Sequence, residues 1–151
     1  MSRGGGGGSV WGGRALVLLR VALGVFLIMK SLSKWGWLMD ATPLATKLTA
    51  WSTRADVAAA SRSYAHLLIP GAPVFGRLVL LGELGGGLAL IGGVWTRPIA
   101  VLSALMVLNF QLASGGLLTV DFLADSSGLV VVAGLFALGL GGRNLPLSIT
   151  S

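Results

Sequence analysis

Two charged side chains lie inside long apolar stretches and are the first candidates for chemistry. Arg20 lies in the apolar run that begins at Ala15, and Glu83 lies near the middle of residues 74–95. A charge at the centre of a membrane helix costs about 2.5–3.5 kcal/mol on insertion scales, so such residues usually serve a purpose. Two roles are open for Glu83: it fixes helix register within a polar network, or it accepts protons or orients a ligand.

The partner of Glu83 must lie at a similar depth in the membrane. An inward ion pair between Arg20 and Glu83 would compensate both charges. Counted from the same side at about 1.5 Å per residue, however, Arg20 lies roughly 10 Å shallower than Glu83. Asn109 and Gln111, in the next apolar run, match the depth of Glu83 better. We therefore predict a candidate intramembrane polar site made of Arg20, Glu83, Asn109 and Gln111.

The residue inventory restricts redox and metal chemistry. The sequence has no cysteine and one histidine, His66, so it has no thiolate ligands and no histidine pair for a haem within a bundle. We expect no metal site, no intrinsic cofactor and no enzymatic activity from the isolated chain. A quinone or a lipid is the remaining kind of bound molecule. His66 is expected to make hydrogen bonds outside the spans.

The composition indicates a membrane protein. Hydrophobic residues make up 54% of the 151 residues and charged residues only 11%, against about 25% charged in soluble domains. Mean hydropathy is +0.87. The net charge of +6 comes from basic residues that stand singly near the ends of apolar runs, which suits lipid headgroups rather than nucleic acid.

Four apolar runs predict an all-α, integral membrane four-helix bundle. They cover residues 15–39, 74–95, 98–118 and 122–143, and a span needs about 20 residues. The fourth is the weakest, because its strongly apolar part covers only residues 128–140. A signal peptide is the alternative interpretation of the first run, but Arg20 interrupts it and no A-x-A site follows.

Residues 40–72 differ from the spans. Leu44, Leu48 and Trp51 recur at helical spacing, and charged residues flank this stripe. The pattern predicts one or two short interfacial helices between the first two spans. We expect residues 1–13 to be a flexible glycine-rich tail, residues 14–143 a single domain, and residues 144–151 a C-terminal tail.

Small residues in the second span predict close helix packing. Gly82 and Gly86 form a GxxxG step, and Gly85, Ala89 and Gly93 place small residues at every fourth position. Such steps let two helix backbones approach closely in a membrane.

Four spans place both termini on one side of the membrane. That side has four arginines and no acidic residue, so its N-terminal tail should resist translocation. The opposite side has slightly more basic residues, which the positive-inside rule would place in the cytoplasm. We expect the termini to be cytoplasmic.

Several short motifs resemble the DoxX family of small bacterial membrane proteins. They are Arg20-x-x-x-Gly24, Phe26 with Lys30 or Lys34, the segment from Gly82 to Gly86, and Thr96-Arg97-Pro98. The similarity covers about residues 14–142 and implies the bacterial inner membrane. The family is named after a subunit of a terminal quinol oxidase, and relatives form part of a thiosulfate:quinone oxidoreductase. The resemblance places Arg20, Glu83 and Arg97 at the family's characteristic polar positions.

Two functions follow as hypotheses. The first is an accessory subunit that packs in a larger respiratory or photosynthetic electron-transfer complex, with lipids and other membrane subunits as partners. The second is a quinone-binding subunit of a quinone oxidoreductase that uses Arg20 and Glu83. A transporter is less favoured, because no inverted repeat is evident.

Overall fold

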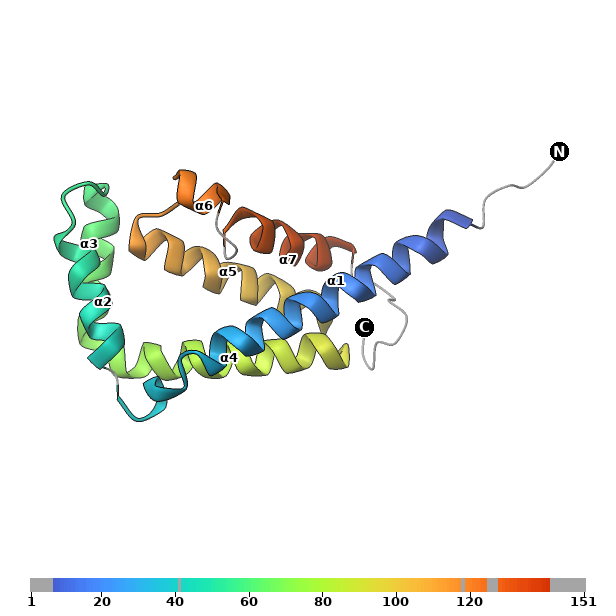
Figure 1. Ribbon diagram of the computed structural model, residues 1–151, viewed down its shortest axis with the longest axis horizontal. Helices are drawn as coiled ribbons and strands as arrows, with labels where there is room; N and C mark the ends of the chain where they lie inside the picture. The colour runs from blue at the N-terminus through green and yellow to red at the C-terminus, as the bar shows by residue number, and fades with distance from the viewer. Residues whose placement is uncertain (1–6, 41, 118, 125–127, 142–151) are drawn as a thin grey trace.

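Helices make up the structure, seen in Figure 1. The computed structural model describes residues 7–40, 42–117, 119–124 and 128–141. In chain order the elements are α1 (Gly7–Leu32), η1 (Trp35–Leu38), α2 (Thr42–Thr53), α3 (Ala59–Leu68), η2 (Ile69–Gly71), α4 (Ala72–Gly92), α5 (Thr96–Ser114), α6 (Val120–Ala124) and α7 (Leu129–Gly141).

Three helical stretches are long and apolar enough to cross a membrane: α1 from Gly12 onward, the run that ends with α4, and α5. The fourth predicted span is represented by α7, which has 13 residues. At 1.5 Å per residue α7 is about 20 Å long, against about 30 Å of hydrocarbon. Together α1, α4, α5 and α7 form a bundle (Figure 1). The chain is an all-α membrane protein whose last bundle helix is shorter than the bilayer core.

The N-terminal tail expected over residues 1–13 differs from the structure, because α1 already begins at Gly7. Adding a residue to an existing helix is cheap compared with nucleating one, so the long apolar helix can extend into a glycine-rich stretch. Residues 1–6 and the expected tail over residues 144–151 lie outside the described residues.

Two glycines set the contact between α1 and α4, which run in opposite directions (Figure 1). A Cβ atom added to Gly87 would lie 2.7 Å from the carbonyl oxygen of Gly24, and one added to Gly24 would lie 2.8 Å from that of Gly87. No larger side chain fits at either position without movement of the backbone. The sequence pattern predicts further close packing of α4 at Gly82 and Gly86.

The apolar core lies where α1, α4, α5 and α7 meet. Its buried members are Leu23, Leu27, Leu90, Ala100, Ala104, Val131, Leu135 and Leu138. Alanines on α5 face leucines on the neighbouring helices, which allows α5 to pack close to the others.

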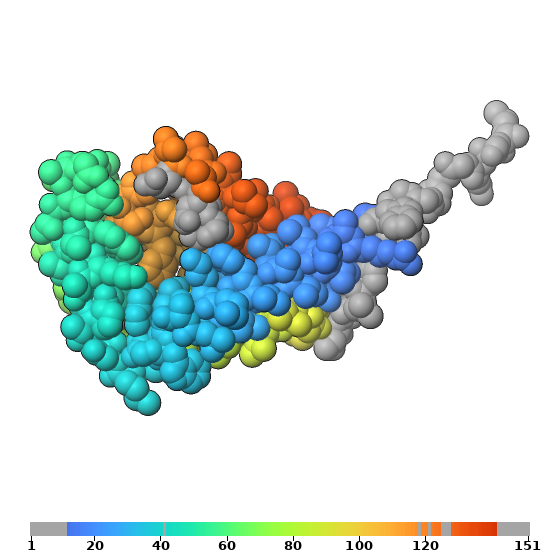
Figure 2. Space-filling view, viewed as in Figure 1, coloured from blue at the N-terminus to red at the C-terminus, as the bar shows by residue number. Residues whose placement is uncertain are grey.

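Residues 40–72 contain two helices, α2 and α3, as the hydrophobic spacing predicts. They pack side by side as one block at the end of the bundle away from the start of α1, as Figures 1 and 2 show. Leu44 and Leu48 are buried in a second apolar cluster, and Trp51 packs against it. The chain bends sharply at η2, where Pro70 and Gly71 separate α3 from α4.

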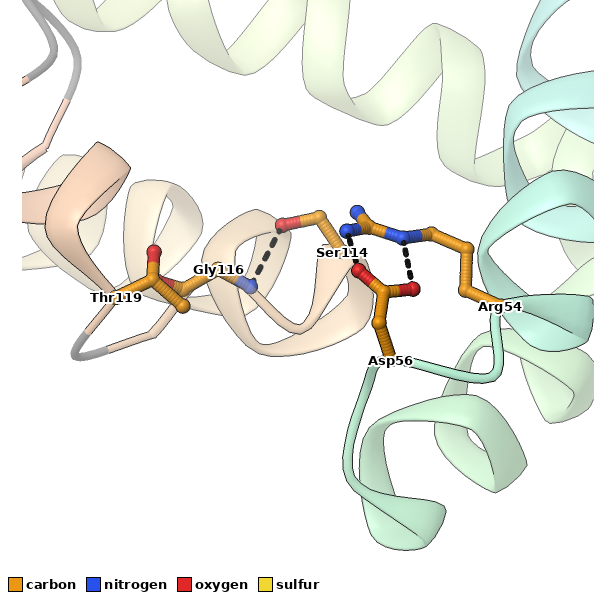
Figure 3. Close-up of polar contacts among 5 residues, drawn as sticks. All are labelled: Arg54, Asp56, Ser114, Gly116 and Thr119. Carbon is orange, nitrogen blue, oxygen red and sulfur yellow. Dashed lines mark hydrogen bonds and ion pairs between the residues drawn. The ribbon is translucent and has the colours of Figure 1, made fainter.

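Side-chain contacts hold this block against the C-terminal end of α5. Val57, in the α2–α3 loop, packs on Gly115, where a Cβ atom would lie only 2.0 Å from the valine Cγ1. The hydroxyl of Tyr64 donates a hydrogen bond to Oδ1 of Asn109. Figure 3 shows the same loop, with an ion pair between Arg54 and Asp56, facing the end of α5.

Candidate functional site

The carboxylate of Glu83 is buried inside the bundle, with the residue only 6% exposed. Its Oε1 atom accepts a hydrogen bond from Nζ of Lys34, and the two groups form an ion pair. Its Oε2 atom is buried and has no hydrogen-bond partner among the described residues. Because an isolated buried carboxylate is strongly unfavourable, the contact with the lysine stabilises this acid at this depth.

The crossing of α1 and α4 brings Lys34 to Glu83. Gly24 contacts Gly87, and two turns further along α1 the hydroxyl of Ser31 donates a 3.1 Å hydrogen bond to the carbonyl oxygen of Leu80. This antiparallel register carries the end of α1 past the turn of α4 that bears Glu83. Lys34 follows α1 directly, and its long side chain reaches back to the carboxylate.

The ion pair lies at the wall of a cavity of about 260 Å³ between α1, η1, α2, α4 and α5. The cavity is open on one side. Its lining residues are Phe26, Leu27, Lys30, Lys34, Trp37, Lys47, Trp51, Glu83, Met106, Val107, Phe110, Gln111 and Ser114. The three lysines are all the lysines in the chain, and Glu83 is its only glutamate. None of the arginines that the structure describes lines the cavity, so the cationic side chains in its lining are all lysines.

Each lysine in the cavity lies over an aromatic ring. Nζ of Lys34 is 5.7 Å from the ring centre of Trp37 and 5.6 Å from that of Phe110. Nζ of Lys47 is 5.6 Å from the same tryptophan ring, and Nζ of Lys30 is 5.5 Å from the ring of Phe26. Cation–π contacts at such distances stabilise an ammonium group that has lost part of its water.

The charge and ring arrangement determine what the cavity can do. Three ammonium groups face one carboxylate, so hydrogen-bond donors and positive charge are in excess. Trp51 and Phe110 meet edge to face at 6.4 Å and supply flat apolar walls beside the charges. Gln111 and Ser114 add neutral polar groups at one side. Such a cavity suits a flat ring with acceptor oxygens at its edge, next to a carboxylate that can exchange a proton.

The structure brings two of the four predicted polar residues to this cavity. Glu83 and Gln111 line it, whereas Asn109 accepts its hydrogen bond from Tyr64 at the contact between α3 and α5. Arg20 is buried, at 2% exposure, but it does not belong to the lining. With Gly24 opposite Gly87, Arg20 lies about 12 Å along the bundle from Glu83.

The predicted pairing therefore changes: the ion-pair partner that the structure gives Glu83 is Lys34 and not Arg20. Sequence reasoning missed Lys34 because counting residues along straight spans placed it at the membrane surface, remote from the middle of α4. A usable signal was present. Lys30 and Lys34 stand one turn apart at the end of the first span, so two long cationic side chains can reach back toward a buried acid.

Of the small residues predicted for packing, Gly86 has the closest neighbour, because an added Cβ atom would lie 3.1 Å from Oγ of Ser103 on α5. A Cβ on Gly82 would lie 3.3 Å from Sδ of Met106. A Cβ atom added to Gly85 would have no neighbour within 4 Å. Ala89 is half-buried. Gly93 has a left-handed conformation, with φ of 71°, and ends α4. Its role is thus a helix cap.

His66 lies exposed on the last turn of α3, outside the bundle helices. Within the described residues, no three histidine, cysteine, aspartate or glutamate side chains lie close enough to hold a metal ion. The charged groups that the fold brings together at this cavity are the three lysines and Glu83.

Comparison with known proteins supports the resemblance noted in the sequence. The model of the DoxX family matches residues 15–116, which is more than half of the chain. The matched part includes α1 from Ala15 onward, the α2–α3 block, α4 and α5, and with them every residue that lines the cavity. No curated protein and no solved structure matches the chain.

Proposed function

The chain belongs to the DoxX family, and on this premise we propose that it is a quinone-binding subunit of a larger electron-transfer complex in the bacterial cytoplasmic membrane. The cavity at Glu83 and Lys34 receives the quinone headgroup. The redox centres that exchange electrons with the quinone lie on partner chains, because this sequence has no cysteine and only one histidine.

The observation that carries this proposal is the buried Glu83–Lys34 pair inside an aromatic cavity. A quinone headgroup is a flat ring with oxygen atoms on opposite edges. It needs aromatic surfaces for stacking, donors for its oxygens and a group that exchanges protons. Ligand cavities usually have about 300–1,000 Å³, so a volume of about 260 Å³ suits a headgroup whose apolar tail lies outside in lipid.

The residues present fit this headgroup. Oε2 of Glu83, which has no hydrogen-bond partner among the described residues, is the atom that accepts a proton from a ring hydroxyl. Lys30 and Lys47 supply N–H donors to ring oxygens. Lysine suits this role better than arginine, because its ammonium group can lose a proton in a protein and a guanidinium cannot. A bound quinol supplies both electrons and protons on oxidation.

Its place as a subunit is supported by a second groove, which shares only Met106 with the cavity at Glu83. The groove has a volume of about 270 Å³ and lies between α4 and α5, lined by Leu81, Gly82, Gly85, Gly86, Ile99, Leu102, Ser103 and Met106. Small residues of this kind allow a helix of another chain to approach α4 closely. We propose this face as the contact with a partner subunit, and cytoplasmic termini for the chain.

Quinone binding is testable on the full chain purified in mild detergent. Trp37 and Trp51 line the cavity, so titration with a short-chain ubiquinone analogue should quench tryptophan fluorescence saturably. Lys47→Met and Glu83→Gln should each weaken binding about tenfold, the effect of one lost charge-assisted hydrogen bond. Arg77→Gln is the matched control, because Arg77 is a cation on α4 that does not line the cavity. Equal affinity in all four proteins would refute the proposal.

The partner is tested by purifying the chain from its native membrane. Chains that co-purify should carry haem, flavin or iron–sulfur centres, and Gly85→Leu should release them while the isolated chain stays folded. Quinol oxidation by this chain without a partner would contradict the assignment of the redox centres to other subunits.

A further inference from the structure

At the other end of the bundle, the turn between α4 and α5 borders a second cavity. Its volume is about 720 Å³, and it is lined by Trp95, Thr96, Arg97, Pro98, Val101, Leu102 and Gly139. None of these residues lines the cavity at Glu83. Among the described residues, the acidic residue nearest in sequence to Thr96 is Glu83, more than three helical turns away, and the charged residue in the lining is Arg97.

The backbone of the turn leaves the start of α5 uncapped. Gly93 and Trp95 both have left-handed conformations, with φ of 71° and 45°, and no side chain caps the helix. The first N–H groups of a helix have no partner inside the helix. These donors and the helix dipole make the end of a 19-residue helix favourable for an anion.

The side chain of Thr96 is a second, independent feature of this turn. Thr96 is only 3% exposed, and its buried Oγ1 has no hydrogen-bond partner among the described residues. A buried hydroxyl without a partner costs free energy, and such groups are rare in folded proteins. Because Thr96 lines the cavity, a ligand held there would provide the missing partner.

Arg97 completes the set of donors. Its Nε donates a 2.9 Å hydrogen bond to the carbonyl oxygen of Gly139 on α7, which holds the guanidinium at the cavity wall. Arginine presents its N–H groups in a planar fork that matches the oxygens of a phosphate group. Trp95 is 63% exposed beside it, as is common for indole rings at the level of lipid headgroups.

We propose that this cavity binds a phosphate group, held by Arg97, by the hydroxyl of Thr96 and by the first N–H groups of α5. An anionic phospholipid headgroup and free phosphate share this chemistry. The site is independent of the quinone proposal, since it shares no residue with the cavity at Glu83.

Native mass spectrometry of the full chain in detergent tests the site with three probes: dioctanoyl phosphatidylglycerol, inorganic phosphate and dioctanoylglycerol, which lacks phosphate. The phospholipid should bind, whereas the diacylglycerol should not. Arg97→Gln should weaken binding at least tenfold and Thr96→Val about fivefold. Arg77→Gln is the control, because Arg77 also donates from Nε to a backbone carbonyl, that of Leu38 at 3.3 Å, and should bind as the wild type does.

Thr96→Val keeps the bond between Arg97 and Gly139, so it tests the site even if Arg97→Gln weakens the fold. Binding of the phospholipid alone identifies a lipid headgroup as the ligand, and binding of inorganic phosphate as well identifies a site for free phosphate. Equal binding of phosphatidylglycerol and dioctanoylglycerol, unchanged binding in both variants, or no binding of either phosphate probe would overturn the proposal.

Discussion

Two of the regions that line the cavity at Glu83 are held by different means. The floor consists of α1 and α4, which contact each other through the backbones of Gly24 and Gly87. The cover consists of the α2–α3 block, which supplies Lys47 and Trp51. Side-chain contacts near the surface, including the bond from Tyr64 to Asn109, hold it on α5.

These different contacts predict that the floor is rigid and that the cover can move. Backbone contact between two long helices leaves little freedom, so Glu83 and Lys34 keep their relative positions. The contacts of the cover with α5 include exposed side chains, and such contacts are individually weak and open more readily. We therefore expect the cover to move more readily than the floor, and the ion pair to stay in place when it does. The following experiments test this division, from the largest expected effect to the smallest.

A leucine at Gly87 should disrupt the floor. Its Cβ alone would lie 2.7 Å from the carbonyl oxygen of Gly24 and 2.8 Å from Cγ1 of Ile28, so the two helices must separate. We expect a loss of about 3 kcal/mol or more of stability, at the upper end for overpacked cores, measured as thermal unfolding in detergent. Gly85→Leu is the matched control on the same helix, because Gly85 has open space. Similar losses in both variants would contradict the assigned crossing.

The ion pair should show strong coupling within the floor. Lys34→Met or Glu83→Leu alone leaves one buried charge without its partner and should cost about 2–3 kcal/mol, somewhat less than a fully buried pair. The double variant should lose clearly less than the sum of the two. A second cycle with Arg20→Met in place of Lys34→Met should be closer to additive. Stronger coupling of Glu83 to Arg20 than to Lys34 would contradict the register described above.

A single methyl group should loosen the cover. Gly115 has φ of 71°, which is unfavourable for alanine, and the added Cβ would lie 2.0 Å from Val57. We expect Gly115→Ala to cost about 1–2 kcal/mol and to increase amide hydrogen exchange in α2 and α3 but not in α1 or α4. Gly116→Ala, next along the chain, is the comparison, since its nearest neighbour is the flexible end of Gln111. Increased exchange in all four helices would show that cover and floor open together.

The smallest effect is expected at the exposed ion pair in the α2–α3 loop. The hydrogen bond from Arg54 lowers the pKa of the Asp56 carboxyl. A lowered pKa in the folded state means that this pair contributes stability above the unfolded pKa of about 3.9. The contribution is lost as the pH falls through the folded pKa.

Arg54→Gln should raise the pKa of Asp56, measured by carboxyl NMR titration, and should leave the unfolding temperature at neutral pH nearly unchanged. A large drop in unfolding temperature would show that this pair, and not Val57 and Tyr64, holds the cover in place.

Much of the fold follows from local sequence patterns. Long apolar runs place the membrane helices, and the spacing of Leu44 and Leu48 predicts a helix between the first two spans, because burial of an apolar face depends on residues close in sequence. The structure begins α1 earlier than the predicted end of the glycine-rich tail. The reason is that glycines next to a long helix can join it without the cost of nucleating a new one. The shortness of α7 was already visible in the limited extent of its apolar run.

Some features of the candidate site also follow from the sequence, whereas others depend on the tertiary structure. The position of Glu83 inside an apolar run predicts a buried acid in need of a partner, and composition alone shows that the chain has no cysteine for redox chemistry. Only the tertiary structure decided that this partner is Lys34, and that all three lysines meet one carboxylate in one cavity. The physical reason is that pairing between helices depends on their register and crossing. Contacts such as that between Gly24 and Gly87 set the register and the crossing. Such contacts cannot be predicted from the periodicity of residues within a single helix.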